Sequence, residues 1–131
     1  HFVYSVASDM DVDPALPDLP ARRERMLYRY GLRAADRIVL DPGFGFAKTA
    51  EQNLLLLDQL PALRTLGRPL LVGPSRKRFL GSVTGREVAG RDAATAAACV
   101  LAFERGARLF RVHNVAETRD ALAVAAAVAG S

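Results

Sequence analysis

Four short apolar runs alternate with longer amphipathic segments along the chain. Each run is rich in β-prone residues and is followed by Pro, Gly, Asp or other turn-forming residues, which is typical of strands. The runs predict strands at Phe2–Val6, Arg37–Leu40, Pro69–Gly73 and Ala107–Val112. The starts of these strands are roughly 30–40 residues apart, a spacing that suits βαβ units.

A segment with helical character follows each predicted strand. Thr49 to Gln52 has the form of a capping box, and the leucines that follow it, Leu54–Leu57, are expected in the core. Asp92 is expected to cap an alanine-rich helix that stops at Gly106. The first predicted helix is Ala21–Tyr30, and the second opens at Thr49 and runs through Leu60 and Leu63. The third and fourth are Ala93–Glu104 and about Ala116–Val128.

This order, strand then helix repeated four times, predicts an α/β fold with a parallel sheet. Two architectures accept four such units: a small doubly wound sheet, or part of a (β/α)8 barrel. A full barrel needs about 250 residues, so a chain of 131 residues would supply about half of one. Because one core suits this length, residues 1–131 are expected to form a single domain.

Composition and charge change this picture little. The chain carries 18 Lys and Arg against 14 Asp and Glu, but Lys48 and Lys77 are its only lysines. Such an arginine bias is weak support for a nucleic-acid partner, and none is predicted. No apolar run reaches the roughly 18 residues of a membrane span, and the chain does not open with a signal peptide, so a cytoplasmic protein without a membrane partner is expected. A lone cysteine, Cys99, excludes a disulfide framework.

Three of the predicted strands end in residues that can carry chemistry. Asp41–Lys48 is a glycine-rich turn between a carboxylate and a lysine, and Gly73–Phe79 holds three successive cations. The third cluster is Arg111–Asn114, in which strand alternation puts Arg111 and His113 on one face. The carboxyl ends of parallel strands lie at one edge, where ligands bind, so the clusters are expected to share one site.

Each cluster alone has an ordinary explanation as a turn or a solvated loop. Together they bring a carboxylate, a lysine, an arginine and an imidazole to one rim. The carboxylate suits adjacent N–H donors of a planar ligand, and the cations suit a phosphorylated or otherwise anionic one. The chain has no P-loop, GxGxxG, HExxH or Ser-His-Asp pattern. The residues therefore predict a site for an anionic heterocycle that bears amide groups.

Three segments of the chain resemble the signatures of the dihydropteroate synthase family. They are Leu40–Lys48 followed by Glu51-Gln52-Asn53, then Leu71–Gly81, then Arg111-Val112-His113, in the family's order and at its spacing. The resemblance covers about Ile38 to the C-terminus. It implies a (β/α)8 barrel transferase of folate biosynthesis that joins 6-hydroxymethyl-7,8-dihydropterin diphosphate to p-aminobenzoate.

The resemblance also implies roles for individual residues. Asp41 would accept hydrogen bonds from the N–H edge of the pterin. Lys77 would contact the pterin ring and, with Arg111 and His113, hold the diphosphate leaving group. Lys77, Arg111 and His113 are the residues expected to serve catalysis.

Phe46 and Ser75 would line the p-aminobenzoate pocket. Two positions depart from the family's pattern. Asn114 stands where aspartate is usual, and because both residues cap helices, little harm is expected. Ala47 replaces a usual glycine, which matters only where the backbone needs a positive φ.

The family's N-terminal half is expected to be absent from this chain, and with it most of the ligands of the Mg²⁺ that the resemblance implies. The chain alone is therefore expected to be inactive, and the whole protein to be a homodimer. A second interpretation stays open, in which the chain is a non-catalytic pterin-fold fragment or homologue that serves as a binding or dimerisation module.

Overall fold

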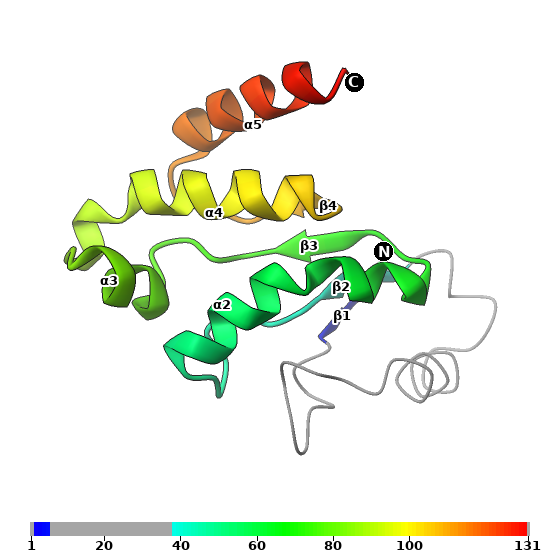
Figure 1. Ribbon diagram of the computed structural model, residues 1–131, viewed down its shortest axis with the longest axis horizontal. Coiled ribbons are helices and arrows are strands. Elements are labelled where there is room, and N and C mark those ends of the chain that lie inside the picture. Colours follow the sequence, from blue (N-terminus) through cyan, green and yellow to red (C-terminus); the bar gives the residue numbers. More distant parts are fainter. Residues whose placement is uncertain (1, 6–37, 131) are drawn as a thin grey trace.

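The computed structural model describes residues 2–5 and 38–130, which form a parallel sheet with helices packed against it (Figure 1). The strands are β1 (Phe2–Ser5), β2 (Ile38–Asp41), β3 (Leu70–Val72) and β4 (Ala107–Phe110). Their order in the sheet is β1-β2-β3-β4, and each neighbouring pair is parallel. The prediction of an α/β fold with a parallel sheet is confirmed. The predicted helix at Ala21–Tyr30 lies outside the described residues.

Strands β3 and β4 are shorter than predicted, and the early end of β4 changes where two site residues lie. β4 ends at Phe110 rather than Val112, so Arg111 and His113 belong to the loop after the strand. Their alternation on a strand face was therefore a wrong prediction. The loop nevertheless begins at the same sheet edge as those after β2 and β3, because all three strands run in parallel.

The helices after β2 begin as predicted but continue differently. The Thr49 hydroxyl accepts the Gln52 backbone N–H at 3.1 Å, and the Gln52 side chain accepts the Thr49 N–H at 2.9 Å. This capping box opens α2 (Ala50–Asp58), which is followed by a 3₁₀ helix, η3 (Leu60–Leu66). The α-helix does not run on through Leu63, because Pro61 lacks an N–H and disfavours an α conformation in the residue before it.

The segment after β3 contains a short helix that was not predicted, α3 (Arg78–Thr84), and a 3₁₀ turn, η4 (Val88–Gly90). The next helix, α4, spans Asp92–Glu104. Asp92 is thus its first helical residue and makes no cap hydrogen bond, which contradicts the predicted capping role. Its carboxylate instead bonds to Arg76, at 2.8 Å.

The core lies between the sheet and the helices that follow β2 and β3. It includes Leu40, Leu70 and Val72 from the strands. In α2, Leu56 and Leu57 are buried, whereas Leu54 and Leu55 are 43% and 38% exposed, so the predicted core role holds for only half of that leucine run. A helix turns by 100° per residue, and four successive side chains cannot all face one sheet.

The last helix, α5 (Val115–Ala129), packs on α4 and lies on its far side from the strands (Figure 1). None of the helices in the described part of the chain is long and apolar enough to cross a membrane. The arrangement leaves the loops after β2, β3 and β4 together at one edge of the sheet, where the candidate site lies.

Candidate functional site

A cavity of about 410 Å³ opens at this edge of the sheet, and it brings together most of the residues singled out from the sequence. Five of the six predicted site residues line it, Asp41 being the exception. The lining residues are Phe46, Gly73, Ser75, Lys77, Arg111, Val112 and His113. They come from three loops that are far apart in the sequence, so only the parallel sheet makes them neighbours.

Arg111 and Asp41 form an ion pair, with 3.3 Å between Nη2 and Oδ2. The other oxygen of Asp41, Oδ1, accepts the Gly43 backbone N–H at 2.9 Å. Asp41 is buried, whereas the Arg111 side chain is 60% exposed, so the pair places a buried carboxylate behind an accessible guanidinium. A Cβ at Gly73 would lie 3.1 Å from Arg111 Nη2, so the absence of a side chain there lets the guanidinium lie against the backbone.

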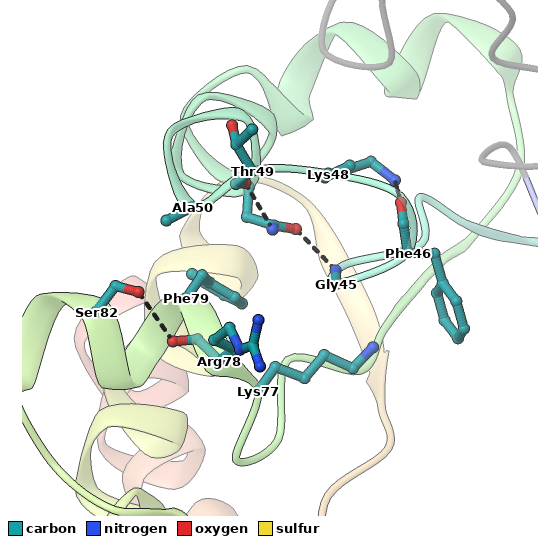
Figure 2. Close-up of a pocket in the computed structure, with 10 residues that line it drawn as sticks. Gly45, Phe46, Lys48, Thr49, Ala50, Lys77, Arg78, Phe79 and Ser82 are labelled. Carbon is teal, nitrogen blue, oxygen red and sulfur yellow. Dashed lines mark hydrogen bonds between the residues drawn. The ribbon is translucent and has the colours of Figure 1, made fainter.

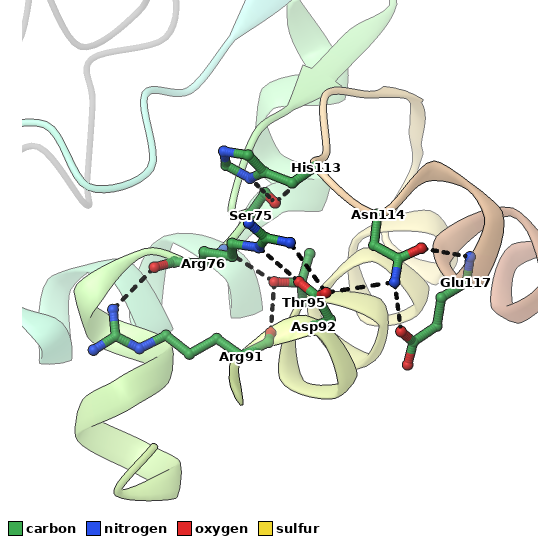
Figure 3. A network of polar contacts seen from close by, with 8 residues as sticks. All are labelled: Ser75, Arg76, Arg91, Asp92, Thr95, His113, Asn114 and Glu117. Atoms are coloured by element: carbon green, nitrogen blue, oxygen red, sulfur yellow. Dashed lines mark hydrogen bonds and ion pairs between the residues drawn. The ribbon is translucent and has the colours of Figure 1, made fainter. Parts of the chain in front are cut away.

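Ser75 and His113 are joined by two hydrogen bonds (Figure 3). The His113 backbone N–H donates to Ser75 Oγ at 3.0 Å, and Ser75 Oγ lies 2.7 Å from His113 Nδ1. If the hydroxyl donates to Nδ1, the neutral ring carries its hydrogen on Nε2. A doubly protonated ring carries one there as well. Nε2 points away from Ser75 and can donate to a ligand in both of these states, whereas a neutral ring with its hydrogen on Nδ1 would donate to Ser75 Oγ and leave Nε2 as an acceptor.

Lys77 crosses the site toward the loop after β2. Its ammonium donates to the Phe44 carbonyl oxygen and lies 4.7 Å from the centre of the Phe46 ring. Burial lowers the pKa of Lys77, while Asp41 opposes that shift and Arg111 adds to it. Gly45 has φ of 83°, and a Cβ there would lie 2.7 Å from Lys77 Cδ. Only glycine satisfies both conditions without displacing the lysine.

A second cavity, of about 470 Å³, adjoins the first, since Phe46 and Lys77 line both. Figure 2 shows Lys77 extended along it toward Phe46, with Arg78 on the same side. Lys48 lines it as well and donates to the carbonyl oxygens of Gly43 (2.8 Å) and Phe46 (3.1 Å). Burial lowers the pKa of Lys48, and the nearby charge of Lys77 lowers it further.

Asn53 is a buried residue of the site that sequence reasoning did not single out. Its Oδ1 accepts the Gly45 N–H at 2.8 Å, and its Nδ2 donates to the Thr49 carbonyl at 2.9 Å. The side chain thus ties the glycine-rich loop to the first turn of α2. The available signal was its place one turn after Thr49, inside one of the segments that resemble the family's signatures.

The two departures from the family's pattern have different structural outcomes. Ala47 has a φ of 51°, in the left-handed region, so the positive φ that would make its side chain costly is present. Asn114 precedes α5 and its side chain accepts the Glu117 N–H at 3.1 Å, which confirms the expected cap. The Asn114 amide also donates to Asp92, at 3.4 Å.

The charges around the two cavities favour an anion. Lys48, Lys77, Arg78 and Arg111 line them, no acidic residue of the described chain is among their lining residues, and Asp41 pairs with Arg111 from behind the cavity. Within residues 2–5 and 38–130, no three His, Cys, Asp or Glu side chains are grouped as a metal site requires. These residues do not by themselves fit Mg²⁺.

The sequence of this chain is similar to those of known pterin-binding proteins. The family model described as "Pterin binding enzyme" matches residues 5–113. Dihydropteroate synthase of Synechocystis sp. is 54% identical over 81 residues, which are 61% of this chain and 28% of that protein. The enzyme of the same name from Neisseria meningitidis serogroup C is 47% identical over 91 residues, or 68% of this chain and 32% of that protein.

Solved structures agree with this result. The crystal structure of dihydropteroate synthase from Yersinia pestis matches with a TM-score of 0.84 and 30% identity, covering 98% of this chain and 58% of that one. The Xanthomonas albilineans enzyme in complex with 7,8-dihydropteroate matches with a TM-score of 0.82 and 39% identity, over 98% and 50%. The same enzyme with 4-aminobenzoic acid gives 0.80 and 42%, over 97% and 48%. The chain thus spans about a third or less of the two sequence relatives and about half of the structures.

Proposed function

Because this chain belongs to the pterin-binding enzyme family, we propose that it carries the diphosphate-binding part of a dihydropteroate synthase. The proposed reaction joins 6-hydroxymethyl-7,8-dihydropterin diphosphate to p-aminobenzoate. The observation that carries the proposal is the 410 Å³ cavity, in which Lys77, Arg111 and His113 face one space. The names of the relatives support the same transferase activity, and one solved relative holds 4-aminobenzoic acid.

The proposed chemistry is a displacement at the methylene carbon of the pterin. A bond forms between that carbon and the amino nitrogen of p-aminobenzoate, and the bond from carbon to the diphosphate oxygen breaks. The electron pair of the broken bond leaves with diphosphate, and the amine nitrogen loses a proton to solvent. Because an arylamine is already nucleophilic, the main electrostatic task is to stabilise the leaving group.

Lys77, Arg111 and His113 suit that task. Arg111 can present a planar fork of N–H donors to phosphate oxygens, and Nε2 of His113 can add another donor. Lys77 supplies a compact charge between the two cavities. All three lie directly after rigid strands or in a turn held by hydrogen bonds, so little reorganisation is needed when the leaving group departs.

Asp41 is proposed to accept hydrogen bonds from the N–H edge of the pterin. Each of its oxygens already accepts one bond, from Gly43 or from Arg111, and each can accept another. Phe46 is proposed to offer its exposed ring to p-aminobenzoate, with Ser75 beside it in the same cavity.

The larger architecture belongs to the proposal as well. Four parallel strands in chain order suit four consecutive units of a (β/α)8 barrel, because a doubly wound sheet reverses its strand order. Residues 1–131 would then be one partial domain. The remaining units, Mg²⁺ ligands, a second copy in a homodimer and a cytoplasmic location are proposed for the complete protein.

Replacing Arg111 with alanine tests the proposed diphosphate site. Affinity for the pterin diphosphate should fall about tenfold or more, whereas affinity for the free hydroxymethyl pterin should change much less, because only the former presents the anion. Calorimetric titration of the chain with each ligand measures both. Arg108→Ala is the matched control, since Arg108 lies on β4 and bonds to Phe103 and Ala107 carbonyls outside both cavities. Equal weakening of both ligands would contradict the assignment.

Turnover requires a different experiment, because the chain alone is proposed to be inactive. A polypeptide supplying the rest of the relatives' length is added, and diphosphate release is followed with both substrates and Mg²⁺ present. Release that depends on p-aminobenzoate supports the synthase. Pterin binding without release in the reassembled protein would favour the non-catalytic binding module.

A further inference from the structure

Arg76 has a backbone conformation that arginine rarely adopts. Its φ is 57°, in the left-handed region, where a side chain crowds the backbone. Residues held in this way persist only where their surroundings leave no alternative, and they are frequent at functional sites. Arg76 stands between two proposed site residues, Ser75 and Lys77, but lines neither cavity.

The start of α4 holds Arg76 through three separate groups (Figure 3). The guanidinium donates to both oxygens of Asp92, at 2.8 and 3.2 Å. The backbone N–H donates to Thr95 Oγ1 at 3.0 Å, and the carbonyl oxygen accepts from Arg91 Nη1 at 3.0 Å. Arg91, Asp92 and Thr95 are called the α4 clamp below.

The side chains of the clamp residues are held in place by further contacts of their own. Thr95 is buried, and its hydroxyl donates to the Arg91 carbonyl at 2.8 Å while it accepts from Arg76. Arg91 also donates to the Arg86 carbonyl, and its guanidinium passes so close to Gly81 that a Cβ there would lie 2.5 Å from Nη2. The hydrogen bonds from Arg76 hold the pKa of the Asp92 carboxyl below its usual value.

The geometry on either side of Arg76 depends on this turn. Ser75 Oγ meets the ring and the backbone N–H of His113, and Lys77 reaches Phe44 and the Phe46 ring. Rotation of the Arg76 backbone out of the left-handed region would swing both neighbours away from these partners. Asp92 also accepts from Asn114, the residue after His113, and so contacts two of the three loops, those after β3 and β4.

We propose that the α4 clamp is a positioning device: by holding Arg76 in the left-handed conformation, it aims Ser75 at His113 and Lys77 at the cavity. The clamp residues touch no ligand and act through their neighbours. This inference rests on the proposed function only in its consequence, that the clamp raises affinity for the diphosphate group.

Amide hydrogen exchange of the 131-residue chain tests the device without any ligand. In Asp92→Ala, exchange at two backbone N–H groups should accelerate about tenfold: that of Arg76, which bonds to Thr95, and that of His113, which bonds to Ser75. Asp58→Ala removes another ion pair, with Arg105, and should change neither rate. Acceleration at Arg76 alone would mean that Asp92 is merely a local structural residue and would overturn the proposal.

Titration with inorganic diphosphate then measures the consequence for the site. Affinity should fall between about tenfold and a hundredfold in Asp92→Ala, with the unfolding midpoint in urea recorded alongside. Should that variant fail to fold, Thr95→Val removes the acceptor of the Arg76 N–H at nearly constant volume. Unchanged affinity in a folded variant whose two amides do accelerate would also overturn the proposal.

Two substitutions of Arg76 separate positioning from direct contact. Arg76→Ala loses the hydrogen bonds to Asp92 and keeps the free-energy cost of a left-handed backbone. Arg76→Gly loses the same hydrogen bonds but adopts a positive φ freely. Diphosphate affinity should therefore be higher in the glycine variant than in the alanine variant. Equal loss in both would point to a guanidinium that binds the ligand directly and would contradict the clamp. If the unaltered chain binds no diphosphate, the proposed function fails, and the two exchange rates still decide the clamp.

Discussion

Two residues other than glycine, Ala47 and Arg76, adopt left-handed backbone conformations beside the site, with φ of 51° and 57°. They differ in how they are held. Arg76 is fixed by bonds from its side chain and both its backbone groups, whereas Ala47 has only a methyl group, which gains nothing from the conformation. Substitution by glycine should therefore remove the free-energy cost of the left-handed backbone at Ala47 and stabilise the chain. At Arg76 no such gain is expected, because the hydrogen bonds of its side chain would be lost.

Ala47→Gly should stabilise the chain by about 0.5–1 kcal/mol. Glycine removes the crowding of a left-handed alanine, and the greater freedom of glycine in the unfolded state offsets part of that gain. Urea unfolding followed by circular dichroism measures the difference. The matched control is Ala97→Gly, at an exposed position inside α4, which should destabilise by about 1 kcal/mol. A loss of stability in Ala47→Gly would contradict this account.

The loop after β2 is shaped by α2 as much as by its own glycines. The capping box orients the first turn of the helix, and Asn53 extends from the next turn back to the Gly45 N–H. Because Gly45 faces the aliphatic part of Lys77, the helix and the lysine are coupled through this loop. A buried amide in α2 thus helps to shape a cavity that it shares with Lys77.

Asn53→Ala should cost about 1–3 kcal/mol of stability, because it removes the acceptor of the Gly45 N–H and the donor to the Thr49 carbonyl. It should also weaken diphosphate binding, since the loop that contacts Lys77 loses its anchor. Gln52→Ala is the control: its bond is exposed, and its removal should cost only about 0.5 kcal/mol. Stability like that of the unaltered chain in Asn53→Ala would show that the loop holds its shape without the helix.

Cys99 lies on the buried face of α4, so the reactivity of its thiol measures whether this part of the core is closed to solvent. Cys99 is fully buried, and burial raises its pKa to about 11. The thiolate is the reactive form of cysteine. In the folded chain, reagents therefore cannot reach the Cys99 sulfur, and the thiol stays protonated. Cys99 is also the only cysteine of the chain, so any alkylation reports on this one position.

Iodoacetamide at pH 8 should therefore modify Cys99 only when the structure opens. The rate should be far lower in buffer than in denaturing urea, and saturating diphosphate should lower it further, because a ligand that binds the folded state reduces the population of open states. Mass spectrometry of timed samples measures both rates. Equal rates in buffer and in urea would mean that α4 does not seal the core.

Local pattern was enough to predict the four parallel strands, the helices α2, α4 and α5 and the three loops of the site, but not the short helix α3. Apolar runs, a capping box and helix-stopping glycines act over a few residues, so they can be recognised in the sequence itself. Five of the six residues singled out from those loops line one cavity, because parallel strands bring the loops to one edge. The family resemblance added the identity of the proposed substrates, which the residues alone had left at an anionic heterocycle that bears amide groups.

Other features depend on contacts between segments distant in the sequence and could not be predicted in this way. Asp92 reads as a helix cap by its position, yet an arginine sixteen residues earlier takes its carboxylate. Likewise, the left-handed turn at Arg76 and the pairing of Ser75 with His113 arise only once β3, β4 and α4 are packed. Hydrogen bonds to a charged or buried group go to whichever partner the fold brings near, and packing, rather than spacing along the chain, selects that partner.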